Sequence, residues 1–540
     1  MDTFDFVIVG AGSAGCVLAS RLSECGRYSV CIIEAGGSDI RPWIQIPIGY
    51  GKTYYQKAVN WMYTTERNPA MDNRQSYWPR GKVLGGSSSI NAMVFVRGNA
   101  EDFNEWADAG NSLWSYEQVL PYFKKLETYQ GGADNYRGGN GPIHVSDVSE
   151  QLHPLCSNYL RAGEQTGVAF NPDMNGASQE GVGLYQINTH NGLRVSAAKA
   201  YLHPALKRQN LHLISCAHVT KVLFEGRAAS AVEFIKEGET KCVSARREVI
   251  LSAGTINSPQ LLQLSGIGDK ELLTALQIPV VLNNPNVGLH LQDHLGMDYL
   301  YRSNQPTLND ELHSWWGKLK AGVKYVCTRK GPLSLSINQG GGFIKTDPQL
   351  RQPDIQLYFS PVSYTRAPVG KRPLLNPDPF SAFLLGLSNC RPRSTGKITI
   401  TSSNPLHAPK IEPNYLSDPR DVETLLKGVK LLRELAKAPA LADIITEEIR
   451  PGKVCQTDEQ LIADIRDYAW TVFHPTSTCR MGVDIEQSVC NQRLQVHSID
   501  RLRVVDASVF PTVTSGNTNA PVMMLAERGA DLILQDHNEH

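Results

Sequence analysis

Three glycines and one acidic residue near the N-terminus have the types and spacing of a dinucleotide-binding site. Gly10, Gly12 and Gly15 fit the pattern G-x-G-x-x-G, and Glu34 follows the glycines by about twenty positions. The first glycine allows a tight turn, the second lets the backbone approach a pyrophosphate, and the third lets a helix pack on a strand. Phosphates would then lie at a helix N-terminus, and Glu34 would accept hydrogen bonds from a ribose.

The elements that must position these residues are two strands and the helix between them. Residues 6–9 are apolar and predict a buried strand, residues 16–22 continue at helical spacing, and residues 29–33 predict a second strand that ends at Glu34. A glycine triplet alone is often only a tight turn. The complete unit of strand, turn, helix, strand and acid favours nucleotide binding.

A second stretch, residues 79–93, has a backbone suited to close contact with a ligand. Two glycines and three serines in Gly85–Ser89 make a poor helix interior, but they can donate N–H and hydroxyl hydrogen bonds. The apolar residues between Ile90 and Val96 favour burial over a surface linker. Asn91 is then a buried amide that needs partners, which the edge of a cofactor ring could supply.

The middle of the chain predicts a second strand–glycine–helix unit and then a different kind of sheet. Ser252–Pro259 follows a β-rich run and precedes a helical stretch, which places another backbone turn at the nucleotide edge. Alternating runs between residues 300 and 455 suit an antiparallel sheet with one covered face. A helix is predicted to begin at Asp418, with the proline that follows in its first turn.

The C-terminal part contains a histidine that could exchange a proton with a bound molecule. His474 lies between bulky apolar residues and a proline in Trp470–Pro475. An imidazole can accept a proton near pH 7, although a lone histidine in apolar sequence is more often a hydrogen-bonded core residue. The run Ser515–Pro521 then leads into a helical pattern whose positive end would point toward whatever Asn519 contacts.

Length and composition limit the remaining possibilities. A chain of 540 residues favours two domains, and 53 Lys and Arg against 53 Asp and Glu argue against nucleic acid or a broadly anionic partner. The 11 cysteines are scattered without a C-x-x-C pair, so we predict reduced, mostly buried thiols and no metal site. The first predicted strand starts within a few residues of Met1, which leaves no room for a signal peptide and favours a cytoplasmic protein.

Four separated motifs together resemble the glucose–methanol–choline (GMC) family of FAD-dependent oxidoreductases, nearly from end to end. They are Gly10–Gly15 with Glu34, Gly81–Asn91, Gly254–Gly268, and His474 with Asn519. The run Ser-Gly-Asn-Thr-Asn-Ala-Pro is most similar to the branch of bacterial choline dehydrogenases and primary alcohol dehydrogenases. The resemblance implies an α/β fold with a Rossmann-type FAD-binding domain and a second, α+β substrate domain on an antiparallel sheet. The implied boundaries are 1–155, 195–300 and 456–540 for the first domain, and 156–194 and 301–455 for the second.

The resemblance also implies roles for particular residues. His474 and Asn519 correspond to the catalytic pair, Asn517 is nearly as well explained as a turn residue, and His294 is expected to be structural. Ile90 stands where some relatives carry a flavin-linked histidine, so we expect non-covalent FAD. The residues implied to contact FAD are Gly10, Gly12, Ser13, Ala14, Gly15, Glu34, Ala35, Gly81, Val83, Gly86, Ser87, Asn91, Ala92, Met93, Val94, Val219, Ala253, Asp506, Ala507, Asn517 and Asn519.

The implied reaction is oxidation of a primary alcohol, with electrons passed to a quinone-type acceptor. The alternative is an oxidase that passes the electrons to oxygen. Two other classes of protein also remain open: a flavin-binding protein without turnover, and a lyase that uses FAD structurally. Gln339 stands where choline-oxidising relatives carry an acid, which argues against choline. Trp470, Phe473 and Phe343 suggest an apolar or aromatic pocket wall, although packing alone would explain these rings.

One further stretch bears on a possible membrane partner. Residues 315–326 mix two tryptophans, three lysines and apolar residues in a way that suits a membrane surface. Peripheral contact with the inner face of a membrane is therefore one expectation. The alternative is a cationic helix that covers the substrate domain, with lysine stems lying along apolar surface.

Overall fold

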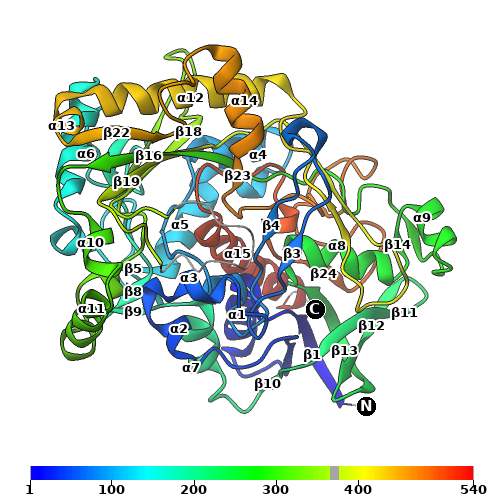
Figure 1. The fold of residues 1–540 in the computed structure, drawn as a ribbon. Helices are drawn as coiled ribbons and strands as arrows, with labels where there is room; N and C mark the ends of the chain where they lie inside the picture. Colours follow the sequence, from blue (N-terminus) through cyan, green and yellow to red (C-terminus); the bar gives the residue numbers. More distant parts are fainter. Residues whose placement is uncertain (1, 365–375, 539–540) are drawn as a thin grey trace.

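Two sheets, each of seven strands, organise the chain (Figure 1). The computed structural model describes residues 2–364 and 376–538. The first sheet has the order β10-β2-β1-β13-β12-β11, with β24 also paired to β13. Its strands are β1 (Asp2–Val9), β2 (Val30–Ile33), β10 (Leu211–Ile214), β11 (His218–Glu225), β12 (Ala228–Lys236), β13 (Glu239–Leu251) and β24 (Leu502–Val504).

The parallel part of this sheet brings the ends of five strands, β10, β2, β1, β13 and β24, to one edge. In the register, Val9 lies opposite Ile33 on one side and Leu251 on the other, and Leu251 lies opposite Val504. The ends of β1, β2 and β13 that lead to this edge are apolar and buried, and side chains of the helix after β1 and of the C-terminal helix share their core. The residues that follow each strand therefore emerge together, at the edge where open α/β sheets bind ligands.

Three helices begin at or near this edge. They are α1 (Ser13–Ser23), α8 (Gly254–Leu264) and α15 (Asn519–Asn538). Because α15 starts at Asn519, the proline at 521 lies in its first turn, where a missing N–H costs no helical hydrogen bond. The strand–turn–helix–strand unit predicted at the N-terminus is confirmed, as is the strand–glycine–helix unit at 252–264.

The second sheet is antiparallel, as predicted, in the order β22-β16-β19-β18-β17-β7, with β23 paired to β16. Helices α12 and α14 lie over it (Figure 1), and apolar side chains of both helices share its core. The start of β16 and the whole of β23 fall in segments that the sequence assigned to the first domain. The strands of the second sheet are β7 (Gly181–Leu184), β16 (Leu295–Ser303), β17 (Gly340–Ile344), β18 (Ile355–Ser360), β19 (Ala382–Asn389), β22 (Ile445–Arg450) and β23 (Trp470–Thr471). The helices over it are α12 (Pro419–Lys437) and α14 (Asp458–Tyr468).

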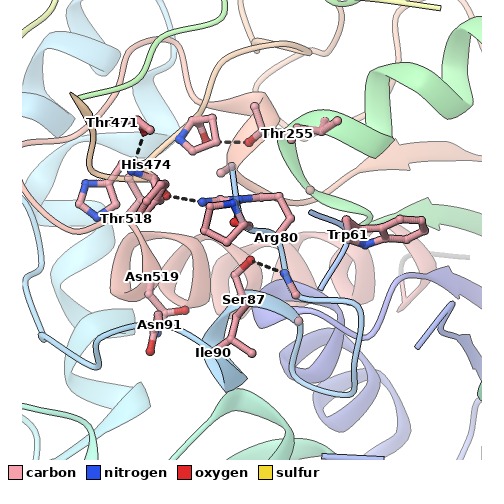
Figure 2. Close-up of a pocket in the computed structure, with 18 of the residues that line it drawn as sticks. Trp61, Arg80, Ser87, Ile90, Asn91, Thr255, Thr471, His474, Thr518 and Asn519 are labelled. Atoms are coloured by element: carbon pink, nitrogen blue, oxygen red, sulfur yellow. Dashed lines mark hydrogen bonds between the residues drawn. The ribbon is translucent and has the colours of Figure 1, made fainter. Parts of the chain in front are cut away.

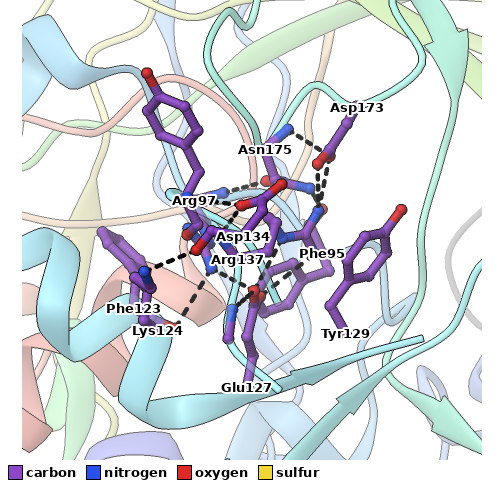
Figure 3. Close-up of polar contacts among 12 residues, drawn as sticks. Phe95, Arg97, Phe123, Lys124, Glu127, Tyr129, Asp134, Arg137, Asp173 and Asn175 are labelled. Atoms are coloured by element: carbon purple, nitrogen blue, oxygen red, sulfur yellow. Dashed lines mark hydrogen bonds and ion pairs between the residues drawn. The ribbon is translucent and has the colours of Figure 1, made fainter. Parts of the chain in front are cut away.

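A buried network of charges holds the segment that runs between the two sheets. Glu127 pairs with Arg97 and with Arg137, whose Nε lies 2.9 Å from the carboxylate, and Arg137 also reaches Asp173 at 2.7 Å (Figure 3). The backbone N–H of Arg97 donates to Asn175 at 2.9 Å. Because both arginines have carboxylate partners, the network fixes residues 94–97 without leaving a buried charge unpaired.

Membrane-spanning helices are not found in the part of the chain that the structure describes, since none of its helices is both long enough and apolar enough.

Candidate active site

A cavity of about 830 Å³ lies between the carboxyl edge of the first sheet and the face of the second. Its walls come from the turn after β1, residues 79–94, the loop 470–475 and the loop 517–519 (Figure 2). This volume is near the upper end of the range for small-molecule and cofactor sites, roughly 300–1,000 Å³. The cavity can therefore hold a large ligand together with a smaller one.

The first glycine turn is shaped by contacts that no larger residue could make. Gly10 has φ +98°, and a Cβ there would lie 2.5 Å from the carbonyl oxygen of Ser252. A Cβ on Gly15 would lie 1.9 Å from the carbonyl oxygen of Gly10, so this glycine packs α1 against β1. Gly15 itself does not line the cavity, and its place agrees with the packing role predicted for the third glycine.

Glu34 closes this end of the cavity. One carboxylate oxygen accepts the N–H of Ala11 at 2.9 Å and the other accepts the N–H of Gly36 at 2.8 Å. Burial raises the pKa of Glu34 to about 7, against the lowering effect of those two N–H groups and of Lys82. A ribose diol at this carboxylate would add two further donors to the ionised form.

The second glycine stretch meets the first one directly. A Cβ on Gly86, which has φ +52°, would lie 2.8 Å from the Cα atom of Gly12. The Oγ of Ser87 accepts the N–H of Gly81 at 3.2 Å. Two glycine turns thus lie against each other at the cavity wall, a cradle of exposed backbone that fits the pyrophosphate and flavin portions of FAD.

Arg194 is a residue of this site that the sequence did not reveal. Its guanidinium donates to the side-chain oxygen of Asn91 at 2.7 Å and to the carbonyl of Ser88 at 3.2 Å, and burial lowers its pKa to about 10. This cation holds Asn91 from behind, opposite the cavity. A single arginine more than a hundred residues away along the chain gives no local signal of such a role.

Most of the residues predicted to contact a cofactor line one cavity. Ile90 also lines it and offers only hydrocarbon, in keeping with non-covalent FAD. Val83 does not line the cavity; it is buried behind it with Ile44, Val59 and Ile90. The predicted residues that do line it are Gly10, Gly12, Ser13, Ala14, Glu34, Ala35, Gly81, Gly86, Ser87, Asn91, Ala92, Met93, Val94, Val219, Ala253, Asp506, Ala507, Asn517 and Asn519.

Two of the four predicted substrate-pocket residues lie elsewhere. Gln339 is buried, and its side-chain oxygen accepts the N–H of His153 at 2.8 Å, so it faces away from the cavity. Phe343 is buried beneath the loop that carries Asn517, where a Cβ on Gly516 would lie 3.1 Å from its ring. Trp470 and Phe473 do line the cavity.

His474 sits at the centre of a chain of hydrogen bonds. Its Nδ1 lies 3.0 Å from Nδ1 of His294, and Nε2 of His294 lies 3.1 Å from the carbonyl oxygen of Cys390. A carbonyl can only accept, so His294 must carry its proton on Nε2 and accept at Nδ1. His474 therefore donates from Nδ1, and its Nε2 carries the lone pair on the cavity side, where it accepts from Nδ2 of Asn517 at 3.2 Å.

Burial keeps both rings neutral. The pKa of His294 is lowered to about 4 by burial, and the pKa of His474 is held well below its usual range by burial, by His294 and by Arg80. A neutral imidazole with one lone pair facing the cavity is a proton acceptor. The sequence placed His474 correctly in the cavity but treated His294 only as packing.

Asn517, rather than the predicted Asn519, is the amide beside His474. The Nδ2 of Asn517 lies 3.2 Å from Nε2 of His474, and its oxygen accepts from Gln356 at 3.2 Å. Asn519 instead accepts the hydroxyl of Ser13 at 2.8 Å, because it already belongs to α15 and faces the first glycine turn. The predicted pairing of His474 with Asn519 is thus replaced by a pairing with Asn517.

Two charged residues missed by the sequence analysis hold the loop that carries His474. Asp293 accepts the backbone N–H of His474 at 2.7 Å and the hydroxyl of Thr471 at 2.5 Å. Arg80, labelled in Figure 2, donates to the carbonyl of Phe473 at 2.6 Å. Phe473 has φ +67°, a conformation that costs energy for a bulky residue. The bonds on both sides of Phe473 stabilise it there.

Comparisons with known proteins agree with this geometry. Family models described as GMC oxidoreductase match residues 4–296 and 392–526. An alcohol dehydrogenase (acceptor) of Pseudomonas putida is 42% identical over 98% of this chain and 96% of its own length. A mitochondrial choline dehydrogenase of Mus musculus is 42% identical over 99% of this chain and 91% of its own.

Solved structures support the same grouping. The crystal structure of pyridoxine 4-oxidase from Mesorbium loti has a TM-score of 0.88 and 30% identity, with 99% of each chain covered. Since the family models and these relatives span both sheets and the cavity between them, the cofactor of this chain is FAD. The chain belongs to the GMC oxidoreductases, as an FAD-dependent enzyme of the alcohol-oxidising type.

Proposed function

We propose that this enzyme oxidises a primary alcohol with an apolar or aromatic body to the aldehyde, with His474 as the base. FAD, when bound, supplies the acceptor for two electrons and the carbon-bound hydrogen of the alcohol. The observation that carries the proposal is the lone pair of His474 Nε2, which the hydrogen bonds through His294 to the carbonyl of Cys390 direct toward the cavity.

The residues around that lone pair have separate roles in the proposed reaction. Nε2 of His474 takes the hydroxyl proton of the alcohol, and Nδ2 of Asn517 donates a hydrogen bond to the same oxygen as negative charge develops on it. Gln356 holds the oxygen of Asn517, which directs the Nδ2 group toward Nε2 of His474 and leaves its second hydrogen for the substrate oxygen. The aldehyde is the product, and the proton remains on His474 until the acceptor half-reaction.

The chemical character of the cavity supports an aromatic or apolar substrate. The rings of Trp470 and Phe473 lie 6.0 Å apart, and Tyr54 lies 5.5 Å from Phe473. The argument from Gln339 against choline is lost, because Gln339 lies outside the cavity. Asp298 lines the cavity and accepts from Trp470 at 2.8 Å, so choline stays as a second candidate with a possible counter-charge.

We propose a quinone-type electron acceptor and contact with the inner face of a membrane. The name of the Pseudomonas putida relative, alcohol dehydrogenase (acceptor), supports transfer of the electrons to a separate acceptor, and the exposed tryptophans and lysines of α11 (Trp315–Thr328) support the membrane contact. The alternative is oxygen, which the name of the solved pyridoxine oxidase supports. The guanidinium of Arg80 at the cavity wall would also favour oxygen reduction, because positive charge stabilises developing superoxide.

Stopped-flow measurements separate these possibilities. The holoenzyme is reduced anaerobically with benzyl alcohol, an aliphatic primary alcohol or choline, and then mixed with oxygen or a soluble quinone. Bleaching of the flavin by benzyl alcohol followed by fast reoxidation with quinone alone is the expected result. Fast reoxidation by oxygen with stoichiometric peroxide would instead show an oxidase, and reduction by choline alone would overturn the substrate proposal.

A further inference from the structure

Helix α11 (Trp315–Thr328) exposes apolar side chains to solvent instead of burying them. Trp315, Trp316, Leu319, Val323 and Val326 are 67%, 73%, 44%, 56% and 71% exposed. On the opposite side of the helix, Ala321 and Tyr325 are buried. The alternative interpretation of this stretch, a cationic helix that covers the substrate domain with lysine stems lying along apolar surface, does not account for two exposed tryptophans. Figure 1 shows α11 at the periphery of the molecule.

The exposed residues form one stripe along the helix. At about 100° per residue, the five apolar side chains fall within roughly 100° of arc. We call these residues the α11 stripe. Tyr325 lies on the opposite side, and its hydroxyl donates to the carbonyl of Gly192 at 2.9 Å. The helix is thus attached to the protein by one face and presents the other outward.

Positive charges flank the α11 stripe and no acidic residue does so within the helix. Lys318, Lys320 and Lys324 are exposed, and Arg329 and Lys330 follow at its C-terminal end. By the same helical geometry, Lys318 lies on one side of the stripe and Lys320 on the other. The nearest acid before the helix is Glu311. Tryptophans with adjoining lysines are the composition of helices that lie in the interface of anionic membranes.

We propose that α11 is the surface through which this protein binds the headgroup region of an anionic lipid bilayer. The helix has 14 residues, which is too short to cross a bilayer but long enough to lie in its plane. The lysines would meet lipid phosphates while the tryptophans and aliphatic side chains enter the interface. A soluble protein partner would not require exposed tryptophans with lysines on both sides of them.

The inner face of α11 leads toward the cavity. Ala321 belongs to a buried cluster with Leu335 and Ile337, and the same cluster contains Tyr50 and Met93. Ile337, Tyr50 and Met93 also line the cavity. A bilayer bound at α11 would therefore lie on the same side of the protein as this wall of the active site. The membrane proposal rests on α11 alone and holds for either electron acceptor.

Cosedimentation of the holoenzyme with vesicles tests the proposal without turnover. We expect binding to vesicles that contain phosphatidylglycerol, weaker binding to pure phosphatidylcholine, and loss of binding as salt is raised. The triple variant Trp315→Ser, Trp316→Ser and Val326→Ser is expected to reduce the partition coefficient by about tenfold or more. Lys320→Glu with Lys324→Glu is expected to abolish the preference for phosphatidylglycerol.

Matched controls lie elsewhere on the surface. Val454, Val483 and Ile485 are also exposed, so their combined replacement by serine should leave vesicle binding unchanged. Lys453→Glu is the control for the two lysine substitutions, because Lys453 is also exposed but lies outside α11. Alcohol oxidation with a soluble dye should be unchanged in all these variants, which separates this proposal from the catalytic one. Equal vesicle binding by the triple variant, or a dimer in the absence of lipid that the triple variant abolishes, would overturn the lipid assignment.

Discussion

The Nδ1 atom of His294 lies 3.0 Å from the Nδ1 atom of His474, and the two rings are nearly perpendicular at 89°. This contact joins residues 180 positions apart. The carbonyl of Cys390 fixes the tautomer of His294, and His294 in turn fixes the tautomer of His474, the ring that faces the cavity. A neutral imidazole has two tautomers, and only the one protonated on Nδ1 has its lone pair on Nε2. His294 is therefore a positioning residue for the proposed base.

Replacing His294 should change catalysis without removing the flavin. In His294→Ala, Nδ1 of His474 loses its acceptor, so the ring can adopt the unreactive tautomer. We expect kcat to fall about ten- to a hundredfold with a smaller change in KM. His294→Asn is the conservative variant, because its side-chain oxygen can still accept from His474, and it should restore most of the rate. Equal kcat in His294→Ala and the parent enzyme, at equal flavin content, would exclude the positioning role.

The two asparagines of the C-terminal loop should separate catalysis from cofactor binding. Asn517→Ala removes the donor beside His474 Nε2, and we expect flavin reduction to slow about ten- to a hundredfold while FAD stays bound. Asn519→Ala removes the acceptor for Ser13, so we expect weaker FAD retention and a smaller effect on reduction by alcohol. Stopped-flow reduction and flavin-to-protein ratio measure the two effects. Slow flavin reduction in Asn519→Ala together with weak FAD retention in Asn517→Ala would instead assign the catalytic amide to Asn519.

Local signals account for what the sequence could predict. The turn at Gly10–Gly15 and the acid at Glu34 belong to one contiguous unit of strand, turn, helix and strand. The close contacts of its glycines and the register of its strands allow few other structures for this segment. Asn517 and Asn519, by contrast, are two residues apart in the same run. Only the start of α15 at Asn519 decides which side chain points toward His474. No local pattern indicates that choice.

Long-range packing decided the other discrepancies. Gln339 stands just before β17, and its side chain turns toward the N-terminus of α6 (Leu155–Gln165) rather than the cavity. Phe343 fills space under Gly516 for the same reason, since neighbouring elements determine which face of the strand meets the ligand. Asp293 and Arg80 act through backbone groups of the loop 471–474, and such contacts leave no spacing to detect.

The acid limit of catalysis should lie at lower pH than for an ordinary histidine. The pKa of His474 is lowered, so the ring remains a base as pH falls through its usual range and is protonated only at more acidic pH. We expect the anaerobic rate of flavin reduction to be flat from about pH 8 to below about pH 6.5. Arg80→Gln removes one positive charge that lowers this pKa, so its acid limb should move to higher pH. A parent profile that already falls above pH 7 would contradict this assignment.

Gly15 should tolerate no side chain. Its Cβ would lie 1.9 Å from the carbonyl oxygen of Gly10, a backbone atom that cannot move without displacing the end of β1. We expect Gly15→Ala to destabilise the protein by about 1–3 kcal/mol or more and to lower its flavin content. Gly322→Ala is the control, since a Cβ there meets nothing within 4 Å, and a helical alanine should leave the melting temperature unchanged or slightly higher. Comparable melting curves for the two variants would show that α1 can move away from β1.

The affinity for FAD should increase with pH because of Glu34. Burial raises the pKa of this carboxyl to about 7 in the protein without ligand, so it holds a proton over much of the acid range. Two ribose hydroxyls would donate to the ionised form more strongly than to the protonated one, so binding would lower the pKa and release a proton. We therefore expect Kd for FAD to fall about three- to tenfold between pH 6 and pH 8, with little change above pH 8.

Flavin fluorescence quenching by the deflavinated enzyme measures this dependence. Glu34→Gln cannot ionise, so its Kd should be higher than that of the parent enzyme at pH 8 and independent of pH in this range. The variant also controls for titration of any other group, because that contribution would persist in it. A parent enzyme whose Kd is as flat as that of Glu34→Gln would show that Glu34 is already ionised at pH 6. The N–H groups of Ala11 and Gly36 would then outweigh the cost of burial.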